Sequence, residues 1–175
     1  MERRARVLLF TGDGKGKTTA ALGMALRACG HGMPVFMLQF VKADGSTGEI
    51  AAARKLPDFE IIQTGLGFLP EPTSPDFARH RDAAERGLHM AAEAIASRKW
   101  RLVILDEVCF AVARGLLKEE DVCKLLRDAP LDCLVVLTGR GATPGLIALA
   151  DTATEMKLVK HAYETGIKAQ EGVEF

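Results

Sequence analysis

The chain alternates between short apolar runs and longer segments in which hydrophobic residues recur at helical spacing. The runs are four to six residues long and are mostly uninterrupted by polar positions. This pattern is typical of strands that are buried on both faces of a sheet. It predicts strands at Val7–Phe10, Val35–Phe40, Phe59–Gln63, Leu102–Leu105 and Cys133–Leu137, with Thr152–Leu158 as a candidate for a last strand before an irregular tail.

The segments between these runs predict helices, whose ends are marked by residues that cap or break them. Ser74 is expected to cap a long helix that has Pro75 at its first position. Thr143 is expected to cap a helix that begins with Pro144. The other predicted helices are Lys17–Cys29, which stops at a Gly-His-Gly sequence, Glu49–Lys55 and Lys118–Arg127.

This alternation predicts an α/β fold with a mostly parallel, doubly wound sheet and helices on both faces. The 175 residues suit a single domain spanning 1–175, without an internal repeat or a linker. In such folds, ligands bind at the carboxyl ends of the strands. Polar residues follow the predicted strands at Phe10, Phe40, Gln63, Leu105 and Leu137, so we expect the functional site at that edge.

A glycine-rich segment, TGDGKGKTT at residues 11–19, joins the first strand to the first helix. This is the context of a phosphate-binding loop and favours a P-loop NTPase-like fold. Glycines let backbone N–H groups point at an anion, and the helix N-terminus adds partial positive charge. Lys17 is placed to reach the terminal phosphates, and the Thr18 hydroxyl to bind Mg²⁺. The predicted nucleotide-binding residues are Gly12, Asp13, Gly14, Lys15, Gly16, Lys17, Thr18 and Thr19.

The loop departs from the pattern G-x-x-x-x-G-K-[ST] because Thr11 stands where the first glycine belongs. Its glycines are closely spaced, and Lys15 adds a second cation. The alternative interpretation is a glycine-rich turn that binds nothing. We disfavour it because three glycines, two lysines and two threonines fall within the eight positions 12–19.

Two further polar sites follow strands at the same predicted edge. Asp106 and Glu107 end the most apolar strand, as in a Walker B motif, where a carboxylate binds Mg²⁺ directly or through water. We therefore predict a metal site of Thr18, Asp106 and Glu107, and a catalytic group of Lys17, Thr18 and Glu107. Arg140 lies between two glycines, where it is placed to reach a phosphate or a carboxylate. The alternatives are an acidic pair that caps a helix and, for the arginine, a surface turn.

Composition and charge exclude several classes of function. The residues are 48% hydrophobic and 26% charged, and the formal net charge is zero, so no basic field favours nucleic acid as a partner. The apolar runs are too short for a membrane span or a signal peptide, which predicts a cytoplasmic protein without a membrane partner. The four cysteines form no C-x-x-C pair, and buried, reduced thiols are expected at Cys29, Cys109, Cys123 and Cys133.

Several catalytic patterns are missing from the sequence. These are a serine–histidine–aspartate order with a nucleophile elbow, a zinc cluster of cysteines and histidines, and a kinase catalytic loop. A nucleophile, if one is needed, is therefore expected from the second substrate. The residues by themselves indicate a P-loop protein that uses Mg²⁺ with ATP or GTP.

Five segments resemble, in order, the signature of P-loop-type ATP:corrinoid adenosyltransferases. They are TGDGKGKTTAA at 11–21, QFVK at 39–42, LDE at 105–107, TGRG at 138–141 and the tail at 159–175, and they span nearly the whole chain from Arg6 on. The resemblance implies that the Co(I) of a corrinoid attacks the 5′ carbon of ATP, forming adenosylcobalamin or a precursor and releasing triphosphate. It also implies Mg²⁺ or Mn²⁺, a homodimer, an electron donor such as reduced flavodoxin, and a nucleotide reversed relative to other P-loop proteins.

The loop before the long helix resembles the family only in part. The family has G-F-x-W there, and its Phe and Trp face the cobalt and displace its lower ligand. Residues 67–70 read GFLP, so Phe68 is the predicted corrinoid contact and Pro70 replaces the Trp. Only Met1–Ala5 precede the first strand, whereas family members often carry a longer N-terminal segment that helps to cover the corrinoid.

Two other functions remain open at this point. Pro70 suggests an ATP-binding corrinoid carrier or regulatory module without transfer activity. A general P-loop NTPase or small-molecule kinase would use the same phosphate loop. A kinase or ATPase releases ADP, whereas adenosyl transfer releases triphosphate, so the product distinguishes these functions.

Overall fold

The computed structural model describes residues 5–173 of the chain. Met1–Arg4 and the last two residues of the predicted tail segment, Glu174 and Phe175, lie outside the described residues. Six strands form one sheet in the order β3-β2-β4-β5-β1-β6, and all of its strand pairs are parallel. The strands are β1 (Arg6–Thr11), β2 (Val35–Gln39), β3 (Phe59–Gln63), β4 (Leu102–Asp106), β5 (Leu134–Thr138) and β6 (Thr152–Glu155).

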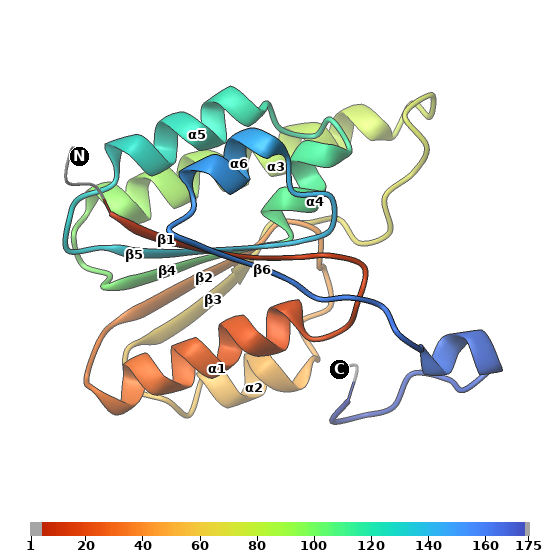
Figure 1. The fold of residues 1–175 in the computed structure, drawn as a ribbon, viewed down its shortest axis with the longest axis horizontal. Coiled ribbons are helices and arrows are strands. Elements are labelled where there is room, and N and C mark those ends of the chain that lie inside the picture. The colour runs from red at the N-terminus through yellow and green to blue at the C-terminus, as the bar shows by residue number, and fades with distance from the viewer. Residues whose placement is uncertain (1–4, 174–175) are drawn as a thin grey trace.

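Helices cover both faces of this sheet, which confirms the predicted α/β architecture (Figure 1). One face carries α1 (Lys17–Gly30) and α2 (Gly48–Ala53). The opposite face carries α3 (Phe77–Ala96), α4 (Val108–Ala113), α5 (Glu119–Asp128) and α6 (Pro144–Leu149). A short 3-10 helix, η1 (Ala162–Thr165), lies in the C-terminal tail, away from the sheet.

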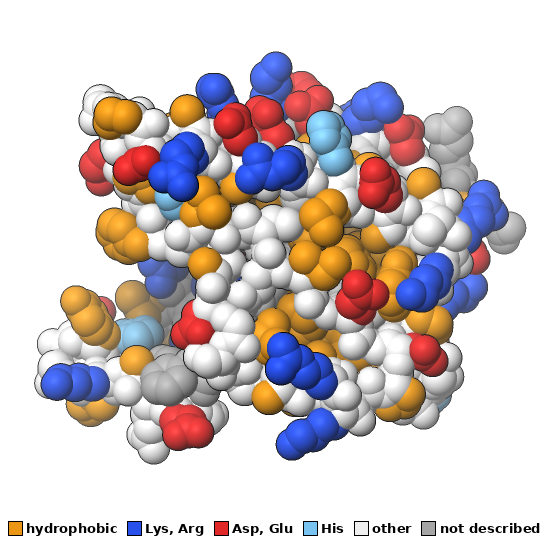
Figure 2. Space-filling view, turned by 180° about the vertical axis from the view of Figure 1, so that it is seen from behind, with side chains coloured by type: hydrophobic (Ala, Val, Ile, Leu, Met, Phe, Trp, Pro, Cys, Tyr) orange, Lys and Arg blue, Asp and Glu red, His pale blue; other side chains and the backbone are white. Residues whose placement is uncertain are grey.

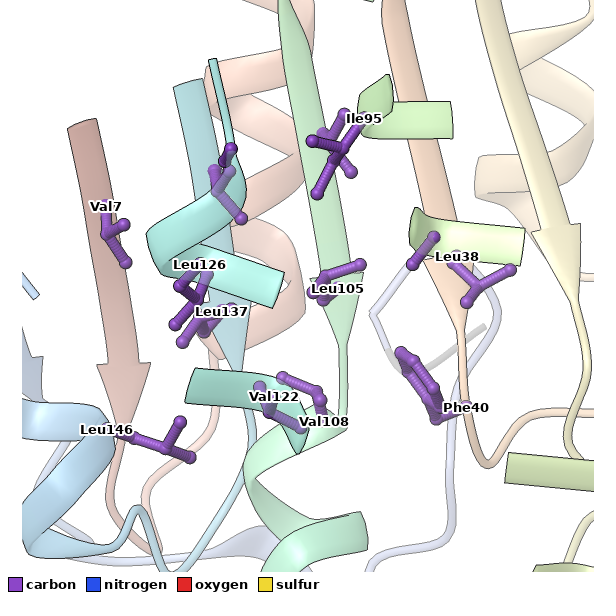
Figure 3. Packing of buried hydrophobic residues seen from close by; sticks show 14 of the residues in the cluster. Val7, Leu38, Phe40, Ile95, Leu105, Val108, Val122, Leu126, Leu137 and Leu146 are labelled. Carbon is purple, nitrogen blue, oxygen red and sulfur yellow. The ribbon is translucent and has the colours of Figure 1, made fainter. Parts of the chain in front are cut away.

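The hydrophobic core lies in two layers, one on each side of the sheet. On the α1 side, small buried residues of the helix, Ala21, Ala25 and Ala28, let it pack closely against the strands. On the other side, Leu105 and Leu137 from neighbouring strands lie under side chains of α5 (Figure 3). Every residue of β2 and β4 is buried, as expected for central parallel strands.

Strand β1 is less completely buried than its apolar sequence predicts. Val7 and Leu9 are fully buried, whereas Leu8 and Phe10 on the other face are only partly buried. They pack at the margin of the α1-side layer. The neighbouring strand β6 is exposed along its length, so β1 lies close to an open edge of the sheet.

Most predicted elements end within two residues of their observed bounds, but two ends and one helix differ in ways that have a structural reason. Helix α3 begins at Phe77 and not at Pro75, because Ser74 belongs to a turn that precedes the helix. In this turn the Ser74 hydroxyl accepts a hydrogen bond from the N–H of Asp76, and the Ser74 carbonyl accepts one from the N–H of Phe77. Strand β6 ends at Glu155 and not at Leu158. Helix α4 was not predicted, because most of its residues are buried and its apolar sequence has no polar face to give a helical period.

The cysteines form no disulfide in the described part of the chain, where all four are free. Cys109, Cys123 and Cys133 are buried as predicted, whereas Cys29 is only half-buried. Burial raises the pKa of Cys109 to about 12 and that of Cys133 to about 11, so both thiols stay protonated at neutral pH. Within residues 5–173, no helix has the length and apolar character needed to cross a membrane.

Candidate active site

The phosphate loop, the loop before α3 and the C-terminal tail lie at the same end of the sheet (Figure 1). This is the end where β1 leads through the loop into α1, as predicted for a site at the carboxyl ends of parallel strands. A pocket of about 530 Å³ opens there. Of the predicted residues, it is lined by Lys15, Gly16, Lys17, Thr18, Thr19 and Glu107.

Lys17 is held inside the phosphate loop. Its Nζ donates to the carbonyl oxygens of Gly12 and Gly14, both at 2.7 Å, and the residue is only 7% exposed. Gly16 precedes it with φ 111°, a left-handed conformation that a side chain would strain. Burial lowers the pKa of Lys17, and the nearby carboxylate of Glu107 opposes this effect. The ammonium group is therefore partly desolvated and would gain from an anion.

Asp106 is fully buried and accepts hydrogen bonds from three other elements at the site. Its Oδ1 accepts hydrogen bonds from the hydroxyls of Thr18 at 2.8 Å and Thr138 at 2.7 Å. Its Oδ2 accepts from Nε2 of Gln39 at 3.1 Å. The carboxylate thus ties the start of α1 to the ends of β2 and β5, and orients the Thr18 hydroxyl. The roles of Gln39 and Thr138 were not predicted, although a polar residue at the end of a buried strand is a signal that points to them.

Glu107 presents the second carboxylate to the pocket. It adopts a left-handed conformation, with φ 63°, and its N–H donates to the Thr138 hydroxyl at 2.9 Å. Burial and then the charge of Asp106 raise the pKa of its carboxyl, while Lys17 and Arg140 act in the opposite direction. Strained backbone and a shifted pKa in a pocket are typical of functional residues. Arg140 is exposed and is not among the residues that line the pocket, but its charge acts on both Lys17 and Glu107.

The C-terminal tail crosses the phosphate loop. The N–H of Gly14 donates to the Met156 carbonyl at 2.7 Å, and the Lys15 ammonium donates to the Val173 carbonyl at 2.7 Å. A Cβ at Gly12 or Gly14 would lie 2.5 or 2.7 Å from the Met156 oxygen. These two glycines are therefore needed for the passage of the tail, a role that the motif alone did not reveal. Gly172 and Val173 add a wall to the pocket.

Gly14→Ala is expected to destabilise the protein by about 1–3 kcal/mol, because its methyl group would be forced against the Met156 carbonyl. The φ of Gly14 is not positive, so the cost comes from this contact and not from the backbone conformation. Gly23→Ala is the control: the site is an exposed helical position of α1 with open space around the new Cβ. This control should gain roughly 0.5–1 kcal/mol. Chemical unfolding would measure the free energy of unfolding of both variants. A Gly14→Ala variant as stable as the wild type would contradict the close passage of the tail over the phosphate loop.

Phe68 lies outside the nucleotide pocket, on the loop before α3. It is 96% exposed and lines a separate hollow of about 330 Å³ with Pro70, Arg79 and His80. The loop is fixed beside the segment that follows β2. The N–H of Gly67 donates to the Val41 carbonyl at 3.0 Å.

Exposed hydrophobic side chains also mark the tail. In Figure 2 the tail forms the lobe that projects at the lower left, and orange side chains lie on its surface. Residues of the tail such as Val159, Tyr163 and Ile167 are more than half exposed. Apolar surface is thus present on the Phe68 loop, which lines a separate hollow, and on the tail, whose Gly172 and Val173 line the nucleotide pocket. Exposed apolar surface of this kind suits a large, partly apolar second ligand.

The described residues contain no group of three or more histidine, cysteine or acidic side chains that would hold a metal by itself. The donors present are the Thr18 hydroxyl and the carboxylates of Asp106 and Glu107. Such a set is too small for a closed metal site. It suits a cation that also binds substrate phosphates and water, as Mg²⁺ commonly does.

Comparison of the fold with solved structures agrees with the observed architecture. The flagellar accessory protein FlaH from Methanocaldococcus jannaschii superposes with a TM-score of 0.59 over 87% of this chain and 71% of that chain. The two sequences are only 11% identical, so the similarity concerns the fold alone.

Sequence comparisons identify the family. A corrinoid adenosyltransferase of Pseudomonas aeruginosa is 42% identical over 177 residues, covering 99% of this chain and 85% of that protein. Corrinoid adenosyltransferase CobA of Salmonella typhimurium is 37% identical, covering 99% of this chain and 87% of that protein. The model of the family "ATP:corrinoid adenosyltransferase BtuR/CobO/CobP" matches residues 3–175. The chain, with its phosphate loop and its buried Asp106, therefore belongs to the ATP:corrinoid adenosyltransferase family.

Proposed function

We propose that this protein transfers the 5′-deoxyadenosyl group of ATP to the Co(I) centre of a corrinoid and releases triphosphate. The observation that carries the proposal is that Lys17, Thr18 and Glu107 line one pocket, which suits a triphosphate bound together with a cation. The N–H of Gly67, in the loop of Phe68, donates to the carbonyl of Val41, the residue before the pocket-lining Lys42, which supports a corrinoid site next to the nucleotide. The family match and the named relatives support the same reaction.

The reaction needs no nucleophile from the protein. The electron pair of Co(I) forms the cobalt–carbon bond at the 5′ carbon of ATP. The pair of the broken carbon–oxygen bond leaves with the triphosphate, which gains one negative charge. The protein has to orient the nucleotide and stabilise this charge, and Lys17 and the N-terminus of α1 are the groups suited to both tasks.

We also propose that Mg²⁺ or Mn²⁺ accompanies ATP. Hard oxygen donors fit these ions, and Thr18 and Glu107 face the pocket where the phosphates would lie. Asp106 is engaged by Thr18, Thr138 and Gln39, so it would act mainly by orienting the Thr18 hydroxyl. A bound cation would neutralise part of the triphosphate charge.

Asp106→Asn and Glu107→Gln are each expected to raise the Mg²⁺ concentration that gives half-maximal activity. The first replaces an acceptor of Thr18 by a group that can donate, and the second removes a charge from the pocket. Initial rates at a fixed ATP concentration and increasing Mg²⁺ would measure the shift. Asp132→Asn, which removes an exposed ion pair with Arg101, is the control. An unchanged metal dependence in both site variants would contradict the metal assignment.

An anaerobic assay with chemically reduced cobalamin and ATP tests the proposed reaction directly. We expect the absorbance of adenosylcobalamin to appear together with inorganic triphosphate. Release of ADP would favour a general kinase or ATPase, which the family match does not favour. Corrinoid binding without a cobalt–carbon bond would favour a carrier or regulatory module, the alternative suggested by Pro70.

The remaining features implied by the family resemblance are proposals of the same kind. We propose a cytoplasmic homodimer that receives electrons from a donor such as reduced flavodoxin. The four free cysteines suit a reducing compartment. The corrinoid would be cobalamin or a cobinamide-type precursor. Sedimentation of the purified protein would test the dimer, and transfer from Co(II) cobalamin with reduced flavodoxin would test the donor.

A further inference from the structure

Lys42 lines the nucleotide pocket together with residues of the phosphate loop. It lies in the segment between β2 and α2 and lines the same pocket as Lys17. Its side chain is 33% exposed, so the ammonium group is accessible to a ligand in the pocket. In the sequence, Lys42 stands out only as the last residue of the QFVK segment, which by itself assigns it no role.

The side chain is held by Glu49, at the start of α2. Its Nζ donates to Oε1 of Glu49 at 2.8 Å, and the Glu49 side chain is 11% exposed. Among the described residues, this is the one hydrogen bond that Lys42 makes. An ammonium group has three N–H donors, so the contact leaves capacity for further acceptors. The four-carbon stem of lysine also lets the charge move by rotation of its bonds.

Asp106 lies close to both Lys42 and the predicted phosphate-loop residue Thr18. Its Oδ1 accepts from Thr18, whereas its Oδ2 lies 3.9 Å from the Lys42 ammonium. Thr18 and Lys42 thus approach the two oxygens of one buried carboxylate. Phosphates bound at Thr18 would therefore lie beside Lys42. The positive charge of Lys42 also acts on Glu107 at the same pocket.

We propose that Lys42 is a second phosphate-binding lysine, which leaves Glu49 to bind the triphosphate of ATP and the departing triphosphate product. Lys17 would hold the triphosphate from the phosphate loop, and Lys42 from the segment between β2 and α2. The charge of Lys42 would offset the negative charge that the triphosphate gains when the carbon–oxygen bond breaks. Glu49 is then a positioning residue that keeps Lys42 at the pocket when no anion is bound. This inference rests on the proposed function for the identity of the nucleotide and of the triphosphate product.

The test is the binding of inorganic tripolyphosphate with Mg²⁺, measured by calorimetry on the full chain. Lys42→Met keeps the apolar stem of the side chain but removes its charge. The dissociation constant of this variant for tripolyphosphate should rise about tenfold or more, which is the effect of losing a charge-assisted hydrogen bond. Lys42→Arg should retain most of the affinity. Glu49→Gln should bind as well as the wild type or better, since it removes a negative charge from the pocket. Lys124→Met, which loses an exposed ion pair with Asp128, is the matched control and should not change binding.

A purely structural ion pair predicts a different result. Lys42→Met and Glu49→Gln would then lower the melting temperature alike, and neither would affect tripolyphosphate affinity specifically. That result would overturn the inference, as would a Lys42→Met variant with unchanged affinity. The assay uses no corrinoid, so it separates the two proposals. Tripolyphosphate binding that depends on Lys42 in a protein unable to transfer adenosyl supports the inference and contradicts the proposed function. Equal transfer and equal affinity in the wild type and Lys42→Met contradict the inference alone.

Discussion

Lys17→Ala is expected to reduce adenosyl transfer by about 10²–10³-fold or more, the usual effect of losing one preorganised donor to a developing anion. The ammonium group is held by the carbonyls of Gly12 and Gly14, so little reorganisation is needed when the triphosphate gains charge. The loss should appear mainly in kcat, since this interaction strengthens as the leaving group departs. Single-turnover kinetics with preformed Co(I) cobalamin would measure it.

The control for this experiment is Lys124→Ala, because that lysine lies on the exposed side of α5 in a pair with Asp128. It should show the turnover of the wild type. Thermal unfolding of both variants would separate a folding defect from a defect in transfer. A correctly folded Lys17→Ala protein with near-normal turnover would refute the assignment of Lys17 as the phosphate lysine.

Phe68→Ala is expected to lower transfer by about tenfold or more when the corrinoid has to be reduced on the protein. A Co(II) corrinoid with its lower ligand attached is hard to reduce, so an apolar side chain against that face should favour formation of Co(I). Burying a phenylalanine side chain contributes about 1.5–3 kcal/mol, which corresponds to such a factor. When Co(I) corrinoid is supplied preformed, the loss should be much smaller. Comparison of the two assays on the same protein measures this difference.

The free protein should tolerate this substitution well. Phe68 is 96% exposed, and exposed substitutions usually change stability by less than about 0.5 kcal/mol. Leu131→Ala, at another exposed hydrophobic position, is the control and should affect neither assay. ATP affinity should be unchanged in Phe68→Ala and in Pro70→Trp, because both residues line a hollow that shares no lining residue with the nucleotide pocket. Equal losses in the two assays, or a large defect in ATP binding, would exclude this role of the loop.

Most of the fold could be predicted because its signals are local. Val35–Gln39 and Leu102–Asp106 are apolar at nearly every position and lie at the centre of the sheet, where both faces are covered. The errors occurred where tertiary contacts outweigh local pattern. The helix Val108–Ala113 is buried on most sides and has no amphipathic period to reveal it. Ser74 has the character of a helix cap, but the chain uses it in the preceding turn.

The sequence by itself determined the phosphate loop, the acidic pair after β4 and their common edge, because spacing along the chain specifies a strand, a glycine-rich turn and a helix. Only the tertiary structure decided how these parts contact one another. Thr18 and Asp106 are 88 positions apart, and Lys15 and Val173 are 158 apart. No local pattern encodes such pairs, because they form only when sheet order and crossover connections bring distant segments together. For the same reason, the passage of Met156 over Gly14 and the approach of Lys42 to Asp106 became visible only in the folded chain.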